Sequence, residues 1–195
     1  MITSLSQLDP NGTYTYADYL FWKFEERVEL LRGYVAQMAA PSRVHQGISG
    51  NLYRFLSNAL WKSPCKVYAA PFDVRLPYLS QTQNREITTV VQPDLCVICN
   101  PEKLDDRGCI GPPDLIVEII SPGNSKREMK DKFEIYQESG VLEYWIVNPT
   151  EKMVQVYRRN ETGKYIGLQP FIEGDLLETP IVPGLQINLG EVFDV

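Results

Sequence analysis

Two acidic residues stand in apolar surroundings, where an uncompensated carboxylate is costly to bury. Glu118 has apolar neighbours on both sides within Leu115–Ile120, and Asp94 follows Pro93 at the head of another apolar stretch. Each buried carboxylate needs a cation, a metal ion or a set of hydrogen bonds. Their separation of 24 residues suits neighbouring strands joined by the Gly/Pro-rich loop over residues 105–113. Two converging carboxylates would supply the oxygen ligands that Mg²⁺ prefers.

The alternative is that the two acids have separate structural roles and share no ligand. Asp94 would then be a turn residue at a strand start, and Glu118 would pair with an Arg or Lys side chain. Strand alternation places Asp114 on the same face as Glu118, but Asp114 follows two prolines and is predicted to be a strand-entry turn residue. The pattern alone leaves the shared metal and the separate pairs both open.

The strands and helices around these acids follow from hydrophobic periodicity. Continuous apolar character predicts a buried strand over residues 115–120 and another strand over 143–147. A strand-like stretch over 88–99 contains Pro93, which marks a bulge, an edge or a strand start because proline cannot donate to the ladder. Helical spacing predicts a helix from residues 41–42 to about 60, and a second helix over 125–139 that Gly140 closes.

The flanking segments add strands at both ends. A capping box at Thr15 and Asp18 predicts a helix to about Glu26, and residues 28–38 indicate a two-stranded turn around Gly33. Further predicted segments are a strand over 67–76, loops over 78–86 and 105–113, a hairpin over 153–159 and 165–169, and strand-like fragments from 170 onward. This order predicts one α/β domain, residues 1–195, with its core over about 41–150 and a C-terminal β extension over 151–195.

Composition limits the kind of protein. With 195 residues, 44% of them apolar, and a formal net charge of −6, the chain should have a real core and is not a globally basic nucleic-acid coat. No apolar run approaches the roughly 20 residues of a membrane span. The first residues lack the basic and apolar blocks of a secretory signal. We therefore expect a cytoplasmic protein with no membrane partner.

The four cysteines fit a reducing compartment, in which they act as small buried hydrophobes. They are Cys65, Cys96, Cys99 and Cys109. Cys96 and Cys99 have C-x-x-C spacing, but a strand would point their sulfur atoms to opposite faces. A zinc or redox site at this pair is therefore not expected.

Several short segments, in one order, resemble the bacterial Uma-two family of restriction endonuclease-like proteins. They are Gln92–Leu95, Pro113–Pro122, Lys132–Val141 and Glu143–Val147, preceded by Glu29, Gly33, Pro41, Ser42 and His45. The similarity extends over about residues 15–190. The family belongs to the PD-(D/E)XK nuclease superfamily, so the resemblance implies a restriction endonuclease-like core: a mixed β-sheet flanked by helices, here with extra N-terminal and C-terminal β-strands.

The resemblance also implies a metal site. In the superfamily, a first acid and the (D/E)XK acid bind Mg²⁺, and a lysine assists the attacking water. Asp94 matches the first acid and Glu118 the second, with the Ile119 carbonyl as a further ligand. We expect Mg²⁺ as the cofactor and Mn²⁺ as its substitute.

This chain departs from the superfamily pattern at the lysine. Ile120 stands two residues after Glu118, where the lysine is expected, and the family supplies a lysine from the following helix instead. Lys132 best fits that role, with Lys126 and Lys130 as fallback candidates. The alternative is that Lys132 is a solvated side chain paired with Glu128 at i, i+4 spacing.

Two further residues are candidates for the site. His45 is the only histidine and lies near the start of a helix that has no acid before Lys62. His45 or Gln46 could contact a phosphate or a water, and Glu29 could supply the missing carboxylate. The alternatives are an ordinary, satisfied histidine and a glutamate on an exposed strand position.

These expectations combine into a Mg²⁺-dependent endodeoxyribonuclease that hydrolyses DNA phosphodiester bonds. The alternative is a catalytically inactive nuclease-fold module that binds nucleic acid or a protein partner. Ile120, in place of the usual lysine, and the negative net charge of the chain favour this alternative. Hydrolysis of another substrate by the two acids is a weaker hypothesis, because no sugar-site or acyl-transfer pattern accompanies them. A homodimer could form through Tyr144, Trp145 and Tyr157, unless these aromatic residues belong to the core.

Overall fold

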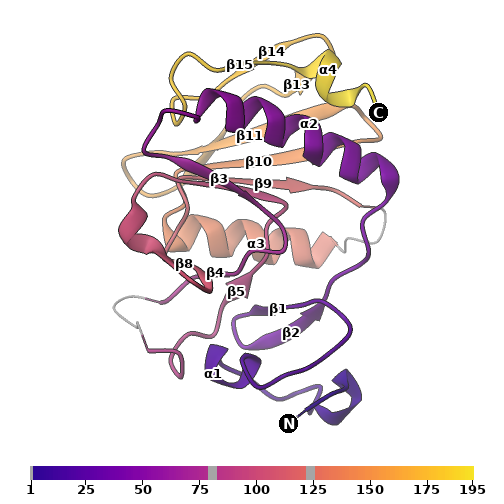
Figure 1. The fold of residues 1–195 in the computed structure, drawn as a ribbon, viewed down its shortest axis with the longest axis vertical. Helices are drawn as coiled ribbons and strands as arrows, with labels where there is room; N and C mark the ends of the chain where they lie inside the picture. The colour runs from indigo at the N-terminus through magenta and orange to yellow at the C-terminus, as the bar shows by residue number, and fades with distance from the viewer. Residues whose placement is uncertain (1, 79–82, 122–125) are drawn as a thin grey trace.

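A mixed β-sheet forms the centre of the fold, with helices on both of its faces (Figure 1). The computed structural model describes residues 2–78, 83–121 and 126–195. The strand order is β12 (Tyr165–Gly167), β11 (Met153–Arg159), β10 (Glu143–Asn148), β9 (Leu115–Ile119), β6 (Leu95–Ile98) and β3 (Lys66–Ala69), and β13 (Phe171–Ile172) also pairs with β11. Strands β9 and β10 pair in parallel, whereas the other neighbours pair antiparallel. The predicted mixed sheet is confirmed.

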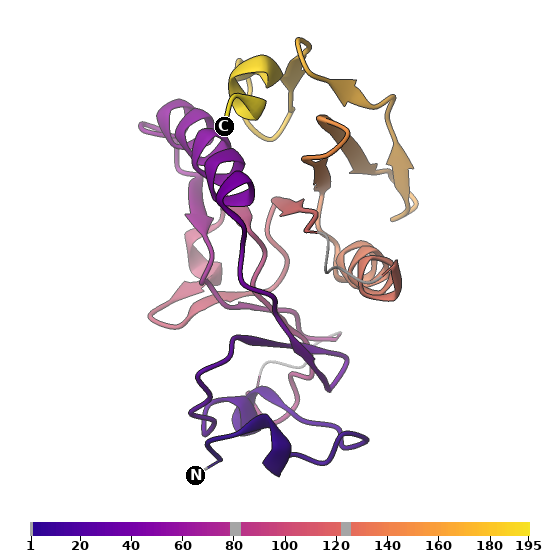
Figure 2. The same ribbon diagram turned by 90° about the vertical axis from the view of Figure 1, so that its right-hand side faces the viewer.

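Two long helices cover opposite faces of this sheet, as Figures 1 and 2 show. Leu52 of α2 (Arg43–Ala59) shares a core with Val117 of β9, whereas Tyr136 of α3 (Lys126–Ser139) shares another core with Ile116. Successive residues of β9 therefore face different helices. Glu118 faces α3, on the same side as Ile116, as strand alternation predicts.

The ends of both helices have local causes. Ser42 precedes α2, and its hydroxyl accepts a hydrogen bond from the His45 backbone N–H at 3.2 Å, which satisfies a donor of the first turn. Gly140 follows α3 with φ of 94°, a left-handed conformation that glycine adopts without strain. The predicted first residue of this helix, Ser125, lies outside the described residues.

A second sheet lies at the N-terminal end, below the central sheet in Figure 1. Its strand order is β2 (Tyr34–Gln37), β1 (Val28–Leu31), β5 (Val90–Val91), β4 (Val74–Arg75), β8 (Gly108–Ile110) and β7 (Leu104–Asp105). The short helices of this half are η1 (Leu5–Gln7), α1 (Tyr16–Tyr19) and η2 (Pro101–Lys103). Tyr16, Trp22 and Leu30 belong to a separate apolar core beneath this sheet. The predicted extra N-terminal strands are confirmed.

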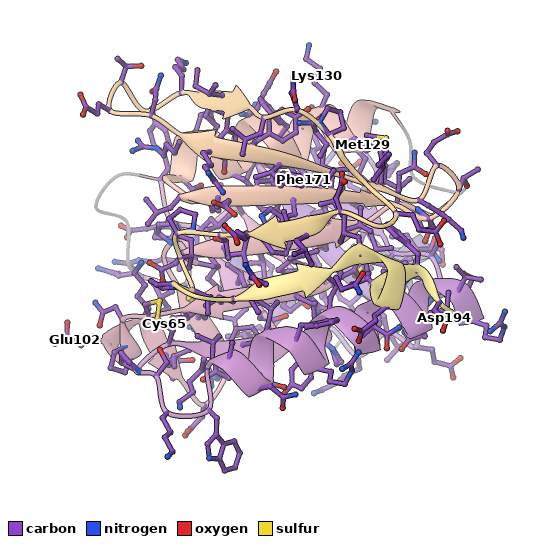
Figure 3. The ribbon with its side chains drawn as sticks, turned by 90° about the horizontal axis from the view of Figure 1, so that it is seen from above. Cys65, Glu102, Met129, Lys130, Phe171 and Asp194 are labelled. Atoms are coloured by element: carbon purple, nitrogen blue, oxygen red, sulfur yellow. A yellow bond between two sulfur atoms is a disulfide. The ribbon has the colours of Figure 1, made fainter. Side chains whose placement is uncertain are left out.

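The C-terminal segment covers part of the α2 face of the central sheet. It contains β14 (Leu176–Glu178), β15 (Gln186–Asn188) and α4 (Leu189–Phe193). Leu177, Ile187 and Val192 join the same core as Leu52, and Figure 3 shows α4 beside α2. The extra C-terminal strands are confirmed, whereas the short helix α4 was not predicted.

Two predicted strands are each divided in the structure. Residues 88–99 form β5 in the N-terminal sheet and β6 in the central sheet, because Pro93 has no N–H and interrupts the ladder between them. Residues 67–76 likewise divide into β3 and β4, with Pro71 between them. Each chain segment therefore crosses from one sheet to the other, and Asp94 stands at one of the crossings.

Two shorter predictions also need correction. The helix that begins after Thr15 ends at Tyr19 rather than near Glu26, although Asp18 accepts the expected capping hydrogen bond from the Thr15 N–H at 2.8 Å. The predicted loop over 105–113 contains β8 and the end of β7, which pair as a hairpin. Periodicity cannot identify elements of two to four residues, since they span barely one repeat.

The prediction of four reduced cysteines is wrong for two of them. Cys65 and Cys99 form a disulfide across the paired strands β3 and β6, drawn at the edge of the sheet in Figure 3. Cys96 and Cys109 are free and buried. The sequence pattern could not show that Cys65, 34 residues earlier, lies opposite Cys99.

Of the aromatic residues considered for a dimer face, two are buried and one is half-buried against the core. Tyr144 and Trp145 are buried, and Tyr157 packs against the core that contains Tyr144. These side chains therefore form core contacts rather than a dimer surface. Among the described residues, every helix is too short or too polar to cross a membrane.

Candidate active site

A cavity of about 260 Å³ lies where the ends of β6 and β9 meet, between α2 and α3. All of the site residues expected from the sequence line it: Glu29, His45, Asp94, Glu118, Ile119 and Lys132. These residues come from five separate segments of the chain. The fold therefore brings the expected residues to one place.

Asp94 ties the start of β6 to the end of β9. Its Oδ2 accepts a hydrogen bond from the Ile119 backbone N–H at 2.7 Å and lies 3.1 Å from Nε2 of His45. Nδ1 of His45 is buried and has no hydrogen-bond partner among the residues that the structure describes. The described contacts of the imidazole ring are with Asp94 and with the Ile119 backbone.

Lys132 lies between two carboxylates and is 6% exposed. Its Nζ is 2.9 Å from Oε2 of Glu29 and 3.0 Å from Oε1 of Glu118. A solvated lysine, the alternative considered for this position, is therefore excluded. Of the fallback candidates, Lys130 is exposed and lies 3.8 Å from Glu134, while the side chain of Lys126 lies outside the described residues.

Glu29 is buried rather than exposed on its strand, at 1% exposure. Besides contacting Lys132, it accepts a hydrogen bond from the Gln92 backbone N–H at 2.7 Å through Oε1. Pairing of β1 with β5 brings these two segments together. Glu29 therefore holds Lys132 from the side of the N-terminal sheet.

Tyr136 is a site residue that sequence reasoning missed. Its hydroxyl donates a hydrogen bond of 2.6 Å to Oε1 of Glu118, one helical turn after Lys132. Lys132 and Tyr136 stand at i, i+4 in the sequence, and this spacing is the local signal for a shared contact. Both side chains of α3 thus reach the same carboxylate oxygen.

The charges that line the cavity are not balanced, because the carboxylates of Glu29, Asp94, Glu118 and Glu128 outnumber the cations of Arg27 and Lys132. Burial raises the pKa of Glu118, the Lys132 charge opposes this shift, and the charges of Asp94 and Glu29 add to it. Burial opposes protonation of Lys132, but the charges of Glu118 and Glu29 outweigh it and raise the pKa of this lysine. The site therefore retains an excess of negative charge that favours an additional cation.

Burial and the neighbouring negative charges also have opposite effects on the pKa of His45. Burial disfavours the imidazolium, but the hydrogen bond to Asp94 and the charges of Asp94 and Glu118 outweigh burial and raise the pKa of His45. A proton on this ring and a metal ion beside Asp94 would compensate the same negative charge. Proton and metal are therefore expected to compete.

The residues present fit a hard divalent cation that is only partly enclosed by protein. Within the described ranges, no three His, Cys, Asp or Glu side chains are arranged to enclose a metal ion. Mg²⁺ commonly uses one or two carboxylates and completes its shell with water and substrate phosphate. Asp94 and Glu118 provide two carboxylates on one cavity, and the excess negative charge there suits a divalent cation.

Comparison with known proteins gives a family, a relative and a solved structure to which the chain is similar. Residues 16–190 match the Uma2 family, described as "Putative restriction endonuclease". An uncharacterised protein of Synechocystis sp. is 26% identical over 179 residues, covering 90% of this chain and 89% of that protein. The crystal structure of a DUF820 protein from Anabaena variabilis, named a "putative nuclease", matches with a TM-score of 0.70 at 17% identity, covering 92% of this chain and 97% of that one. The mixed α/β fold of this chain is thereby shared with a solved structure.

Proposed function

This chain belongs to the Uma2 family, and we propose that it is a metal-dependent endonuclease that hydrolyses DNA phosphodiester bonds. One observation carries the proposal: Asp94, immediately before β6, and Glu118 of the adjacent strand β9 line one cavity, and Nζ of Lys132 contacts Glu118 there. The residue types match those of the nuclease superfamily that the sequence resembles. The proposal assigns DNA as the substrate.

Asp94, Glu118 and the Ile119 carbonyl would hold Mg²⁺, or Mn²⁺ in its place. When bound, such an ion would lower the pKa of a water molecule and offset negative charge on the phosphate. Oxygen donors suit either ion. The Ile119 backbone N–H and His45 would keep the Asp94 carboxylate in position.

Lys132 would act on the substrate from the α3 side. Its ammonium would face the phosphate oxygens on which negative charge builds, which is the form of preorganised stabilisation that lowers a reaction barrier. Glu29 would hold Lys132, and Tyr136 would hold Glu118. In this scheme His45, Glu29 and Tyr136 are positioning residues, because each acts through another side chain.

The test is cleavage of plasmid or oligonucleotide DNA by the purified protein with Mg²⁺ or Mn²⁺. Asp94→Asn and Glu118→Gln preserve side-chain shape, and each should abolish cleavage while circular dichroism shows a retained fold. Glu134→Gln makes the same change of charge on the partly exposed surface of α3 and should leave cleavage intact. Undiminished cleavage by both site variants would remove the assignment.

A second candidate is a nuclease-fold module that binds nucleic acid or a protein without turnover. The contact of Lys132 with two carboxylates favours it, because such a cluster can also serve as a buried ion pair. This candidate predicts tight binding of DNA or a protein partner without cleavage under any divalent ion. A turnover that depends on Glu118 would exclude it.

A further inference from the structure

Two glycines of α2 have different surroundings. A Cβ atom on Gly47 would lie 2.6 Å from Cγ1 of Val195, so close packing of the C-terminal residue accounts for that glycine. A Cβ atom on Gly50 would meet nothing within 4 Å. Glycine inside a helix is less favourable than alanine, so Gly50 needs a reason other than packing.

Gly50 lies on the wall of the candidate active site. Gln46, Ser49, Gly50 and Tyr53 are spaced so that they share one face of α2, and all four line the cavity. Tyr53 is 40% exposed. This face of α2 therefore has a position without a side chain, at Gly50, next to an accessible aromatic ring, at Tyr53.

Arg27 supplies a positive charge to the same cavity. Its Nε and Nη2 donate hydrogen bonds of 3.1 and 2.7 Å to Oε1 of Gln92. Gln92 in turn donates to Oδ1 of Asp73 at 2.8 Å, which fixes the orientation of its amide. Because the acceptor of Arg27 is a neutral amide, the guanidinium charge is less compensated than that of Lys132, and it can attract a phosphate.

The geometry points to a nucleotide subsite, formed by Gly50, Tyr53 and Arg27, that takes one unpaired nucleic-acid strand beside the scissile phosphate. This inference rests on the proposed function and adds the substrate class. A base can stack on the ring of Tyr53 only when the face of the base is not covered by neighbouring bases. Bases of an unpaired strand can be exposed in this way. The missing side chain at Gly50 lets the strand approach the helix closely.

Charge also favours a single strand. A duplex carries one negative charge for about every 1.7 Å of its axis, and a protein that follows it needs many cations. Here the cavity offers Arg27 and Lys132, the second of which already contacts two carboxylates, and Glu25 and Glu26 beside Arg27 are exposed. This arrangement suits a few phosphates better than the surface of a duplex.

Binding of a short, fluorescently labelled single strand, compared with the same strand in a duplex, tests the inference. Anisotropy is measured at fixed ionic strength with Ca²⁺, another cation that takes oxygen ligands. Gly50→Met should fill the subsite and weaken single-strand binding, while its melting temperature stays at or above that of the wild type because methionine favours a helix. Asn58→Met places the same side chain on an exposed part of α2 and should bind like the wild type.

Tyr53→Ala should weaken single-strand binding by about 5- to 150-fold, the value of one stacked base, whereas Tyr34→Ala, at an exposed tyrosine of β2, should not. Arg27→Gln should weaken binding and reduce its salt dependence. The inference is overturned if Gly50→Met and Tyr53→Ala bind like the wild type, if the duplex binds as tightly as the single strand, or if the wild type binds neither probe.

The two proposals can fail separately. If Asp94→Asn and Glu118→Gln leave cleavage unchanged but Gly50→Met and Tyr53→Ala lose single-strand binding, the assigned hydrolysis is wrong and the subsite stands. If the acid variants abolish cleavage while the subsite variants bind and cleave like the wild type, the hydrolysis stands and the subsite is wrong.

Discussion

Nζ of Lys132 lies 3.0 Å from Oε1 of Glu118, although the lysine belongs to α3 and the glutamate to β9. The nuclease superfamily that the sequence resembles has a lysine two residues after the acid, and this chain has Ile120 at that place. Packing of α3 on the sheet brings an ammonium to the same carboxylate from a different element. Glu118 therefore has a cation at hydrogen-bond distance although Ile120 stands two residues after it.

Replacing Lys132 should lower the stability of the fold as well as the rate of the proposed reaction. Lys132→Met leaves the buried Glu29 and the half-buried Glu118 without their shared cation, and removal of one partner of a buried ion pair costs about 3–5 kcal/mol. Urea unfolding measures the loss. Lys130→Met, at a lysine whose side chain is 75% exposed, should change the free energy of unfolding by about 0.5 kcal/mol or less. Equal stability of the two variants would contradict the buried cluster.

His45 should affect metal binding through Asp94. His45→Ala removes one of the two described partners of Oδ2, and loss of a group that orients a metal ligand typically costs about 10- to 100-fold in affinity or activity. Titration with Mn²⁺ by calorimetry measures the affinity. Arg43→Ala, at an exposed position in the first turn of α2, serves as the control. An affinity unchanged by His45→Ala would show that the Ile119 N–H positions Asp94 without help.

Metal binding should weaken as the pH falls. The pKa of Glu118 is raised by burial and by neighbouring carboxylates, and that of His45 is raised by Asp94. Lowering the pH through these raised values converts Glu118 to a neutral acid and His45 to a cation, and both changes oppose a divalent cation. Mn²⁺ titrations across a pH series measure this dependence. An affinity that does not fall on acidification would contradict the raised pKa values.

Tyr136→Phe should shift the pH dependence of metal binding in a direction that can be predicted. The hydrogen bond from Tyr136 favours the ionised form of Glu118, so its removal should raise the pKa of Glu118 further. Metal binding by this variant should therefore develop at higher pH than in the wild type. A shift toward lower pH would show that the hydroxyl does not stabilise the carboxylate.

The disulfide should contribute to stability. Cys65 and Cys99 close a loop with a sequence separation of 34 residues, and such a crosslink typically stabilises a fold by about 2–4 kcal/mol. A reductant should lower the free energy of urea unfolding by this amount. The double variant Cys65→Ala and Cys99→Ala keeps Cys96 and Cys109 and should not respond to reductant. A wild type that is equally insensitive would show that the bond adds no stability.

Local signals in the sequence were sufficient for the main elements and the two central acids. The helix over 43–59, the strand over 115–119 and the stop at Gly140 each follow from periodicity or from a residue with a special backbone preference. Asp94 and Glu118 stood out because a carboxylate in an apolar strand requires compensation. Each of these signals spans a few neighbouring residues, so the sequence contains them in full.

The partners that compensate the charges became known only from the packed chain. Glu29 meets Lys132 across 103 positions of the chain, and Cys65 meets Cys99 because β3 pairs with β6. The surroundings of Gly47 and Gly50 differ for the same reason, since the C-terminal residue packs against only the first. Periodicity shows which face a residue occupies, whereas the group opposite that face depends on how distant segments pack.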